Sequence, residues 1–165
     1  MRALLAALVL CFAAPAAAQT APDVGRAARA LAANWRPVSG ALTEAAIREA
    51  CTGAVEEIAA VEAALPRELT PQSMARVRAP HGLLVIPTGD DPAWAFFIPP
   101  AELSWFTSGM GAIAVLDEGR GLIGVRDAGG RDIAFQLGRA GQRPVLRIRP
   151  PEGAPLTFAG CAPIG

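Results

Sequence analysis

The sequence predicts an α+β protein in which N-terminal helices pack on an antiparallel β-meander of about five to seven strands. Residues 23–79 repeat apolar side chains at helical spacing, whereas residues 82–160 contain short apolar runs separated by turn residues. Such a sheet can curl and close into a barrel. Cys51 and Cys161 follow the leader described below, and an even number of cysteines in an exported protein predicts one disulfide between them.

Residues 1–18 have the order of a bacterial secretory signal peptide. Arg2 supplies a positive charge, residues 3–14 form an apolar run, and Ala16 to Ala18 supply small residues for cleavage after Ala18. The apolar run is too short to cross a bilayer, and no later segment approaches the roughly 20 apolar residues that a transmembrane helix requires. We therefore expect one domain, residues 19–165, in the periplasm or outside the cell. The alternative is that the leader is a membrane anchor or a buried first helix.

Composition and charge exclude several classes of protein. With 52% hydrophobic and 18% charged residues, the chain is not a disordered tail. Every basic residue is arginine, and removal of Arg2 leaves 14 of the 15 basic residues against 15 acidic ones, a formal charge of −1. This balance gives no reason to expect nucleic acid as a partner.

The helical part of the domain is expected to span residues 23–79, and the sheet part residues 82–160. The first helix begins at Asp23, whose carboxylate is a suitable N-cap. Apolar residues then recur at helical spacing as far as Trp35, and Pro37 ends the region.

The second expected helix runs from Thr43, another suitable N-cap, to Pro66. Its apolar stripe consists of Ile47, Cys51, Ala54, Val55, Ile58, Val61 and Leu65. Glu57 lies off this stripe, whereas Cys51 points inward, where a residue of the last strand can reach it. A short third helix is expected to begin at Thr70, with proline at its first position, and to end before Pro80.

The sheet part contains seven candidate strands. They span residues 83–87, 94–99, 112–116, 122–126, 132–137, 145–149 and 156–159. Residues 132–137 and 145–149 alternate apolar and polar side chains, which predicts one buried and one exposed face. Glycine, proline and aspartate lie between the strands, and no helical pattern separates them, as is typical of an antiparallel meander.

Residues 119–124 match the G-x-G-x-x-G pattern of dinucleotide-binding loops. That chemistry needs a strand before the glycines and a helix after them, so that the pyrophosphate meets a helix N-terminus. Here the glycines lead into an apolar run typical of a strand. The segment therefore predicts a hairpin turn, and no cofactor is expected.

His81 is the only histidine and the basis of an enzymatic alternative. It could act as a general base for Ser73, Ser104 or Ser108. None of these serines lies in a G-x-S-x-G motif, so we expect His81 to be an accessible loop residue.

No metal site is expected. A zinc site needs three or four nitrogen or sulfur ligands, whereas the chain has one histidine and commits both later cysteines to the disulfide. Asp90 and Asp91 lack the spacing of a calcium-binding loop and are expected to form a solvated turn.

An arginine-rich face is one half of the candidate ligand surface. Between residues 120 and 149 there are seven arginines and two acidic residues. Strand alternation places Arg143, Arg147 and Arg149 on one face, where guanidinium groups can bind carboxylates or phosphates. The alternative is a solvated outer face that discourages aggregation.

An aromatic cluster is the other half of the candidate surface. It consists of Trp94, Phe96, Phe97, Trp105 and Phe106. Trp94 and Phe96 should face one side of their strand and Phe97 the other, because side chains alternate. Trp94 and Trp105 can line a groove, or the cluster can be the core of the domain.

The function that these residues favour is a non-catalytic exported module that binds an envelope protein or an anionic envelope component. The expectation rests on the lack of connected catalytic residues beside two surfaces able to make contacts. Two alternatives remain: a small periplasmic hydrolase that uses His81, and a barrel that carries an apolar small molecule. The second alternative predicts a cavity inside the sheet.

Overall fold

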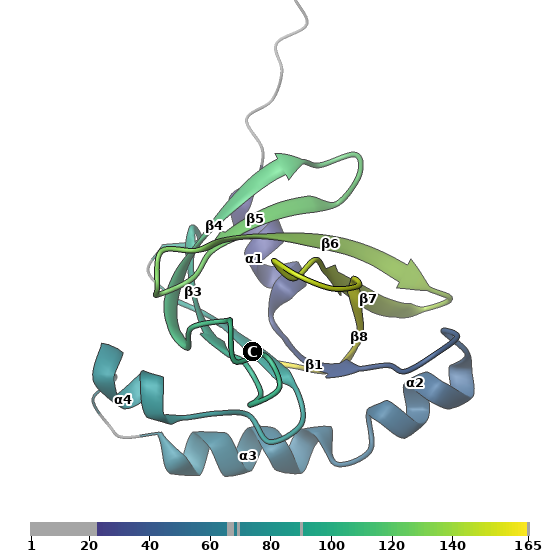
Figure 1. The fold of residues 1–165 in the computed structure, drawn as a ribbon, viewed down its shortest axis with the longest axis horizontal. Helices are drawn as coiled ribbons and strands as arrows, with labels where there is room; N and C mark the ends of the chain where they lie inside the picture. The colour runs from purple at the N-terminus through teal and green to yellow at the C-terminus, as the bar shows by residue number, and fades with distance from the viewer. Residues whose placement is uncertain (1–22, 66–67, 69, 90, 165) are drawn as a thin grey trace, which may run out of the picture.

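Eight antiparallel strands form a closed barrel in which neighbours in sequence pair and β8 pairs with β1 (Figure 1). The computed structural model describes residues 23–65, 68, 70–89 and 91–164, so the predicted leader lies outside the described residues. The strands are β1 (Ala33–Pro37), β2 (Leu83–Pro87), β3 (Trp94–Ile98), β4 (Gly109–Asp117), β5 (Leu122–Arg126), β6 (Asp132–Ala140), β7 (Arg143–Ile148) and β8 (Leu156–Pro163). The predicted α+β class and antiparallel meander are confirmed. The sheet, which the sequence left able to close, is closed, and it has eight strands where about five to seven were expected.

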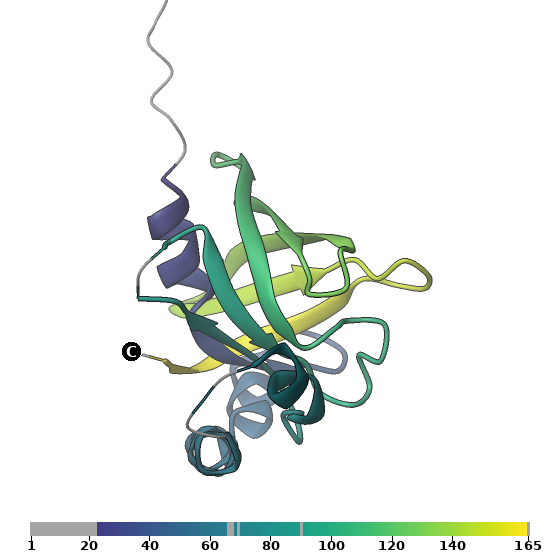
Figure 2. The same ribbon diagram turned by 90° about the vertical axis from the view of Figure 1, so that its left-hand side faces the viewer.

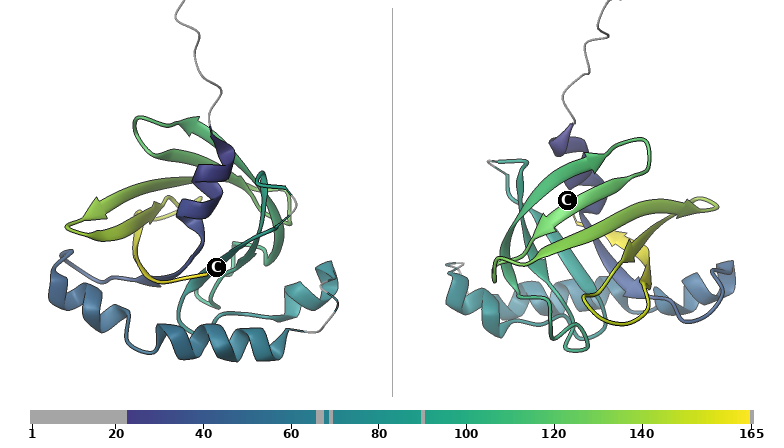
Figure 3. Two further views of the ribbon diagram at one scale, coloured as in Figure 1. Left: turned by 180° about the vertical axis from the view of Figure 1, so that it is seen from behind. Right: turned by 45° about the horizontal axis from the view of Figure 1, so that its top comes forward.

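Four helices lie against the barrel in the described part of the chain. They are α1 (Val24–Leu31), α2 (Glu44–Ala50), α3 (Ala54–Ala64) and α4 (Pro71–Arg76). The last three follow one another along one side of the barrel, whereas α1 lies across one of its ends, apart from them (Figures 1, 2 and 3). Among the described residues, no helix combines the length and the apolar character needed to cross a membrane.

Strand β1 corrects the predicted helix through Trp35. Helix α1 ends at Leu31, and residues 33–37 pair with β2 on one side and β8 on the other. Leu31 and Trp35 have helical spacing, but both side chains are buried in the barrel core, and the Trp35 Nε1–H donates to the Leu31 carbonyl at 2.7 Å. Pairing on both edges overrides the local helical pattern. A strand of the sheet therefore lies inside the predicted helical part.

The predicted helix from Thr43 to Leu65 is two helices, α2 and α3. Gly53 has a φ of +73°, a left-handed conformation that glycine adopts without steric cost, and it separates them. The break changes which residues face the barrel. Val55, predicted to lie in the apolar stripe, is 67% exposed, whereas Glu57, predicted to lie off it, is buried.

The disulfide predicted between Cys51 and Cys161 is confirmed. Cys51 lies at the break between α2 and α3, and Cys161 lies in β8, with their Cα atoms 5.1 Å apart. The bond ties the helical layer to the last strand of the barrel.

The remaining elements match their predictions. All seven candidate strands are present, several of them longer than expected. Asp23 and Thr43 cap α1 and α2, and Thr70 and Ser73 exchange hydrogen bonds at the start of α4. Residues 119–121 form the predicted hairpin turn between β4 and β5.

Aromatic and aliphatic side chains fill the barrel interior. The rings of Phe97, Phe106 and Phe135 contact one another, with centroid separations between 5.7 and 6.2 Å. As predicted, Phe97 faces the opposite side of β3 from Phe96, which packs in a second cluster on the outer side of the sheet. That second cluster includes Val61 of α3, so the two layers share an apolar interface.

A buried polar network joins the same two layers. The Glu57 carboxylate of α3 forms an ion pair with Arg36 of β1, with 3.1 Å between Oε2 and Nη1. Its Oε2 also accepts a hydrogen bond from Asn34 Nδ2 at 2.8 Å, and its Oε1 accepts one from the His81 backbone N–H. The carboxylate thus pairs with one charge and two further donors, as a buried ion must.

Candidate functional site

A hollow on the arginine-rich face is an open groove of about 690 Å³, which we call the arginine groove. Its lining comes from the β4–β5 turn and from the outer faces of β5 to β8. The residues are Arg120, Leu122, Ala134, Gln136, Arg147, Arg149, Pro155 and Thr157.

The floor of the groove is a row of outward side chains across four strands. Leu122 of β5 pairs with Gln136 of β6, Gln136 pairs with Arg147 of β7, and Arg147 pairs with Thr157 of β8. Directly paired residues on one face lie close enough for their side chains to interact. Arg149 follows the end of β7, where its backbone N–H donates to Ala134. The register of the barrel therefore places Arg147 at the centre of this row.

The groove carries positive charge without a matching acidic residue in its lining. Within the described part of the chain, Arg147 and Arg149 have no carboxylate within ion-pairing distance, and Arg120 has only a marginal contact of 4.0 Å with Asp117. The two acidic residues of this region are engaged elsewhere. Asp132 pairs with Arg126, and buried Asp127 accepts hydrogen bonds from three backbone N–H groups.

The pairing of Asp132 with Arg126 lowers the pKa of Asp132, chiefly through hydrogen bonds of 2.7 and 2.9 Å from the guanidinium. Replacing Arg126→Gln is expected to raise that pKa toward its ordinary value. A lowered folded-state pKa stabilises the fold above the unfolded pKa, and the contribution disappears as pH falls through the folded value.

An NMR titration of the aspartate carboxyl carbons measures this shift. Arg139→Gln is a suitable control, because Arg139 lies on the same strand as Asp132 and, among the described residues, pairs with no acid. An Asp132 pKa that moves equally in both variants would contradict a specific pairing.

The residues of the predicted ligand surface lie in separate parts of the structure. Arg147 and Arg149 lie together in the arginine groove, whereas exposed Arg143 lines a separate hollow beside the disulfide. Trp94 lies on the outer face of β3, and in an eight-stranded barrel β3 and β7 are on opposite sides. Trp105 is half-buried and packs against the ring of Phe106. Neither tryptophan lines the arginine groove.

No family model, curated protein or solved structure matches this chain. The candidate site therefore rests on its own geometry.

The residues of the enzymatic alternative are not joined by hydrogen bonds in the described part of the chain. The His81 side chain is exposed, as predicted, and the His81 backbone N–H donates a hydrogen bond to the Glu57 carboxylate. Buried Ser108 accepts a hydrogen bond from Arg78 and donates to a backbone carbonyl. The Ser73 hydroxyl accepts a hydrogen bond from the Thr70 backbone N–H at the start of α4. No observation here favours the hydrolase.

The turn expected at Asp90 and Asp91 lies only partly within the described residues. Asp90 is outside them, and Asp91 accepts a hydrogen bond from the Ala93 backbone N–H at 2.8 Å. This is the local side-chain to backbone bond that aspartate makes in turns.

Three polar residues of the groove were not among the predicted ligand residues: Arg120, Gln136 and Thr157. Their polar side chains were visible in the sequence. Which of them meet Arg147 depends on the register across four strands, and strand alternation alone does not determine that register.

Proposed function

We propose that this protein is an exported, non-catalytic binding module that holds a carboxylate- or phosphate-bearing envelope component in the arginine groove. The observation that carries the proposal is the convergence of Arg120, Arg147 and Arg149 on one groove without an acidic residue in its lining. A guanidinium presents five N–H donors in a planar fork that matches both carboxylate and phosphate oxygens.

The floor of the groove supports the same chemistry. The Gln136 amide and the Thr157 hydroxyl lie on either side of Arg147 and supply further donors. The volume of about 690 Å³ falls within the range typical of small-molecule sites. A ligand the size of a short saccharide phosphate or an acidic peptide end fits this description.

The charge of the whole chain favours a small anionic ligand over a long polyanion. The 15 basic and 15 acidic residues balance, so no strong overall field draws a polymer such as nucleic acid to the surface. The disulfide between Cys51 and Cys161 supports an oxidising compartment, in agreement with the predicted leader.

Arginine replacements test the groove directly. Arg147→Gln and Arg149→Gln are each expected to weaken binding of tripolyphosphate or citrate by about two- to fivefold, because a solvent-exposed ion pair contributes about 0.5–1 kcal/mol. The double variant is expected to lose about tenfold or more. Isothermal titration calorimetry at constant ionic strength measures each affinity.

Arg76→Gln is the matched control, because it removes the same charge from an exposed position on α4, far from β7 (Figure 1). Equal weakening in the control and the groove variants would show that only net charge matters and would refute the site. Failure of both probes to bind the unmodified protein would refute the proposed function.

A further inference from the structure

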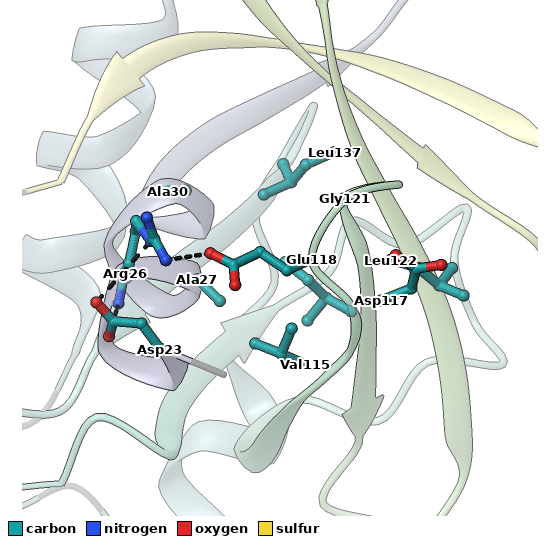
Figure 4. A pocket seen from close by; sticks show the side chains of 11 residues that line it. Asp23, Arg26, Ala27, Ala30, Val115, Asp117, Glu118, Gly121, Leu122 and Leu137 are labelled. Carbon is teal, nitrogen blue, oxygen red and sulfur yellow. Dashed lines mark hydrogen bonds and ion pairs between the residues drawn. The ribbon is translucent and has the colours of Figure 1, made fainter. Parts of the chain in front are cut away.

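A second hollow, which we call the barrel-end pocket, lies between α1 and the hairpin of β4 and β5 (Figure 4). Its volume is about 260 Å³. The lining residues are Asp23, Arg26, Ala27, Ala30, Val115, Asp117, Glu118, Gly121, Leu122, Ile123 and Leu137. The barrel-end pocket shares Leu122 with the arginine groove but otherwise has different lining residues and a different charge.

The floor of the barrel-end pocket is apolar. Val115, Ile123 and Leu137 belong to the core of the barrel or pack against it, and Ala27 belongs to the face of α1 that covers the barrel end. Ala30 adds a methyl group on the solvent side of the helix. These small side chains on α1 leave room above the larger aliphatic groups of the strands.

The size of the barrel-end pocket fits one small hydrocarbon group. A cavity of about 150 Å³ with apolar walls is enough to bind benzene. The volume of about 260 Å³ therefore accommodates a phenyl ring with a short chain.

The rim of the barrel-end pocket is acidic. Asp23 and Glu118 contribute two carboxylates, against one guanidinium from Arg26. The third lining carboxylate, Asp117, accepts a hydrogen bond from the Arg120 backbone N–H and lies 4.0 Å from the Arg120 guanidinium. Arg26 is already paired with both Asp23 and Glu118, and Figure 4 shows the Glu118 side chain reaching across to it. These side chains are at least half exposed, so the pairs exchange readily with another cation. An incoming anion would instead meet the carboxylates and a guanidinium that is already neutralised.

We propose that the barrel-end pocket binds a small organic ammonium compound with an apolar body. The apolar body lies on Ala27, Val115 and Leu137, and the ammonium group competes with Arg26 for the carboxylate of Glu118. This site adjoins the arginine groove at Leu122, which lines both hollows, but the arginine groove has the opposite charge preference.

Three probes of similar size and different charge test the inference: phenethylamine, phenethyl alcohol and hydrocinnamate. NMR titration of protein with labelled methyl groups reports on Val115, Ile123 and Leu137 directly. We expect these methyl signals to shift with the amine at the lowest concentration, with the alcohol at a higher one, and least with the carboxylate. Equal affinity for all three probes, preference for hydrocinnamate, or unmoved methyl signals would overturn the proposal.

Two substitutions separate the roles of charge and shape. Glu118→Gln is expected to weaken phenethylamine binding by about two- to fivefold while leaving phenethyl alcohol unchanged, because it removes one exposed carboxylate. Ala30→Leu keeps a good helix former on α1 but fills the pocket, so it is expected to abolish binding of both probes.

Glu152→Gln is the control for charge, since exposed Glu152 lies in the loop between β7 and β8. If it weakens amine binding as much as Glu118→Gln does, the acidic rim is not the determinant and the proposal fails. Arg147→Gln should leave amine binding unchanged, so the outcome here is distinct from the outcome for the arginine groove. Unfolding curves of each variant show that the fold is retained.

Discussion

Replacing Glu57→Ala is expected to lower the free energy of unfolding by about 3–5 kcal/mol, because it leaves the buried Arg36 guanidinium without its counterion. Both side chains of this pair are less than a tenth exposed. The same carboxylate accepts hydrogen bonds from Asn34 and from the His81 backbone, so its removal leaves further donors without partners. A domain of this size has a total stability of about 5–15 kcal/mol, and the variant therefore approaches the unfolding threshold.

Urea unfolding followed by tryptophan fluorescence measures the effect, since Trp35 is fully buried. Glu56→Ala is the matched control, because Glu56 precedes Glu57 on α3 but is exposed; we expect it to stay within about 0.5 kcal/mol of the unmodified protein.

A double replacement, Arg36→Met with Glu57→Leu, separates the cost of an unpaired charge from the value of the pair. Removing both charges is expected to cost much less than Glu57→Ala alone, because no buried ion is left. If Glu57→Ala were no more destabilising than Glu56→Ala, the buried network would not hold α3 to β1.

Removing the disulfide is expected to cost about 2–5 kcal/mol. The bond joins residues 110 positions apart, and cross-linking so long a loop restricts the unfolded chain strongly. The chain-entropy model gives about 4.7 kcal/mol for a loop of about 100 residues, and measured values are often smaller. The variant with Cys51→Ala and Cys161→Ala should therefore unfold at a clearly lower urea concentration than the oxidised protein.

Reductant provides the control for this experiment. Dithiothreitol should lower the unfolding midpoint of the unmodified protein to near that of the double alanine variant, and should leave the variant unaffected. Alkylation of both cysteines in native, unreduced protein would contradict the bond, as would a midpoint that is insensitive to reductant.

The strands of the meander could be predicted from sequence because each one is short, apolar and bounded by turn residues. Strand β1 could not be predicted from sequence in this way, for a physical reason. Its outward residues, Asn34 and Arg36, are polar but buried under α3, so the strand lacks the usual contrast between a dry and a wet face. Its inward residue, Trp35, continues the helical spacing of α1. Only the pairing with β2 and β8 determines that residues 33–37 form a strand and not a continuation of helix α1.

The break at Gly53 shows a different limit of prediction from sequence. A single glycine within a helical pattern is tolerated or ends the helix, and the choice depends on what the helix packs against. Here the left-handed turn brings Cys51 to Cys161 and turns Glu57 toward β1. These long-range contacts favour the break. They cannot be predicted from the residues next to Gly53 in the sequence.

The candidate ligand residues were predictable in type but only partly in position. Alternation correctly placed Arg147 on the outer face of β7, and composition indicated an excess of arginine in this region. The contribution of Arg120 from a turn, and the separation of Trp94 from the arginines, follow from the closure of the barrel. A meander that stayed open would not place β3 and β7 on opposite sides.

The bond between Cys51 and Cys161 also makes a covalent ring of the chain that contains β2 to β7. A protease that cuts one exposed loop within this ring, such as residues 151–155, produces two pieces that stay joined. The cut strands remain next to their partners at a high effective concentration, so the barrel can stay closed after cleavage. A molecule nicked in this loop would therefore keep its two pieces together until the disulfide is reduced.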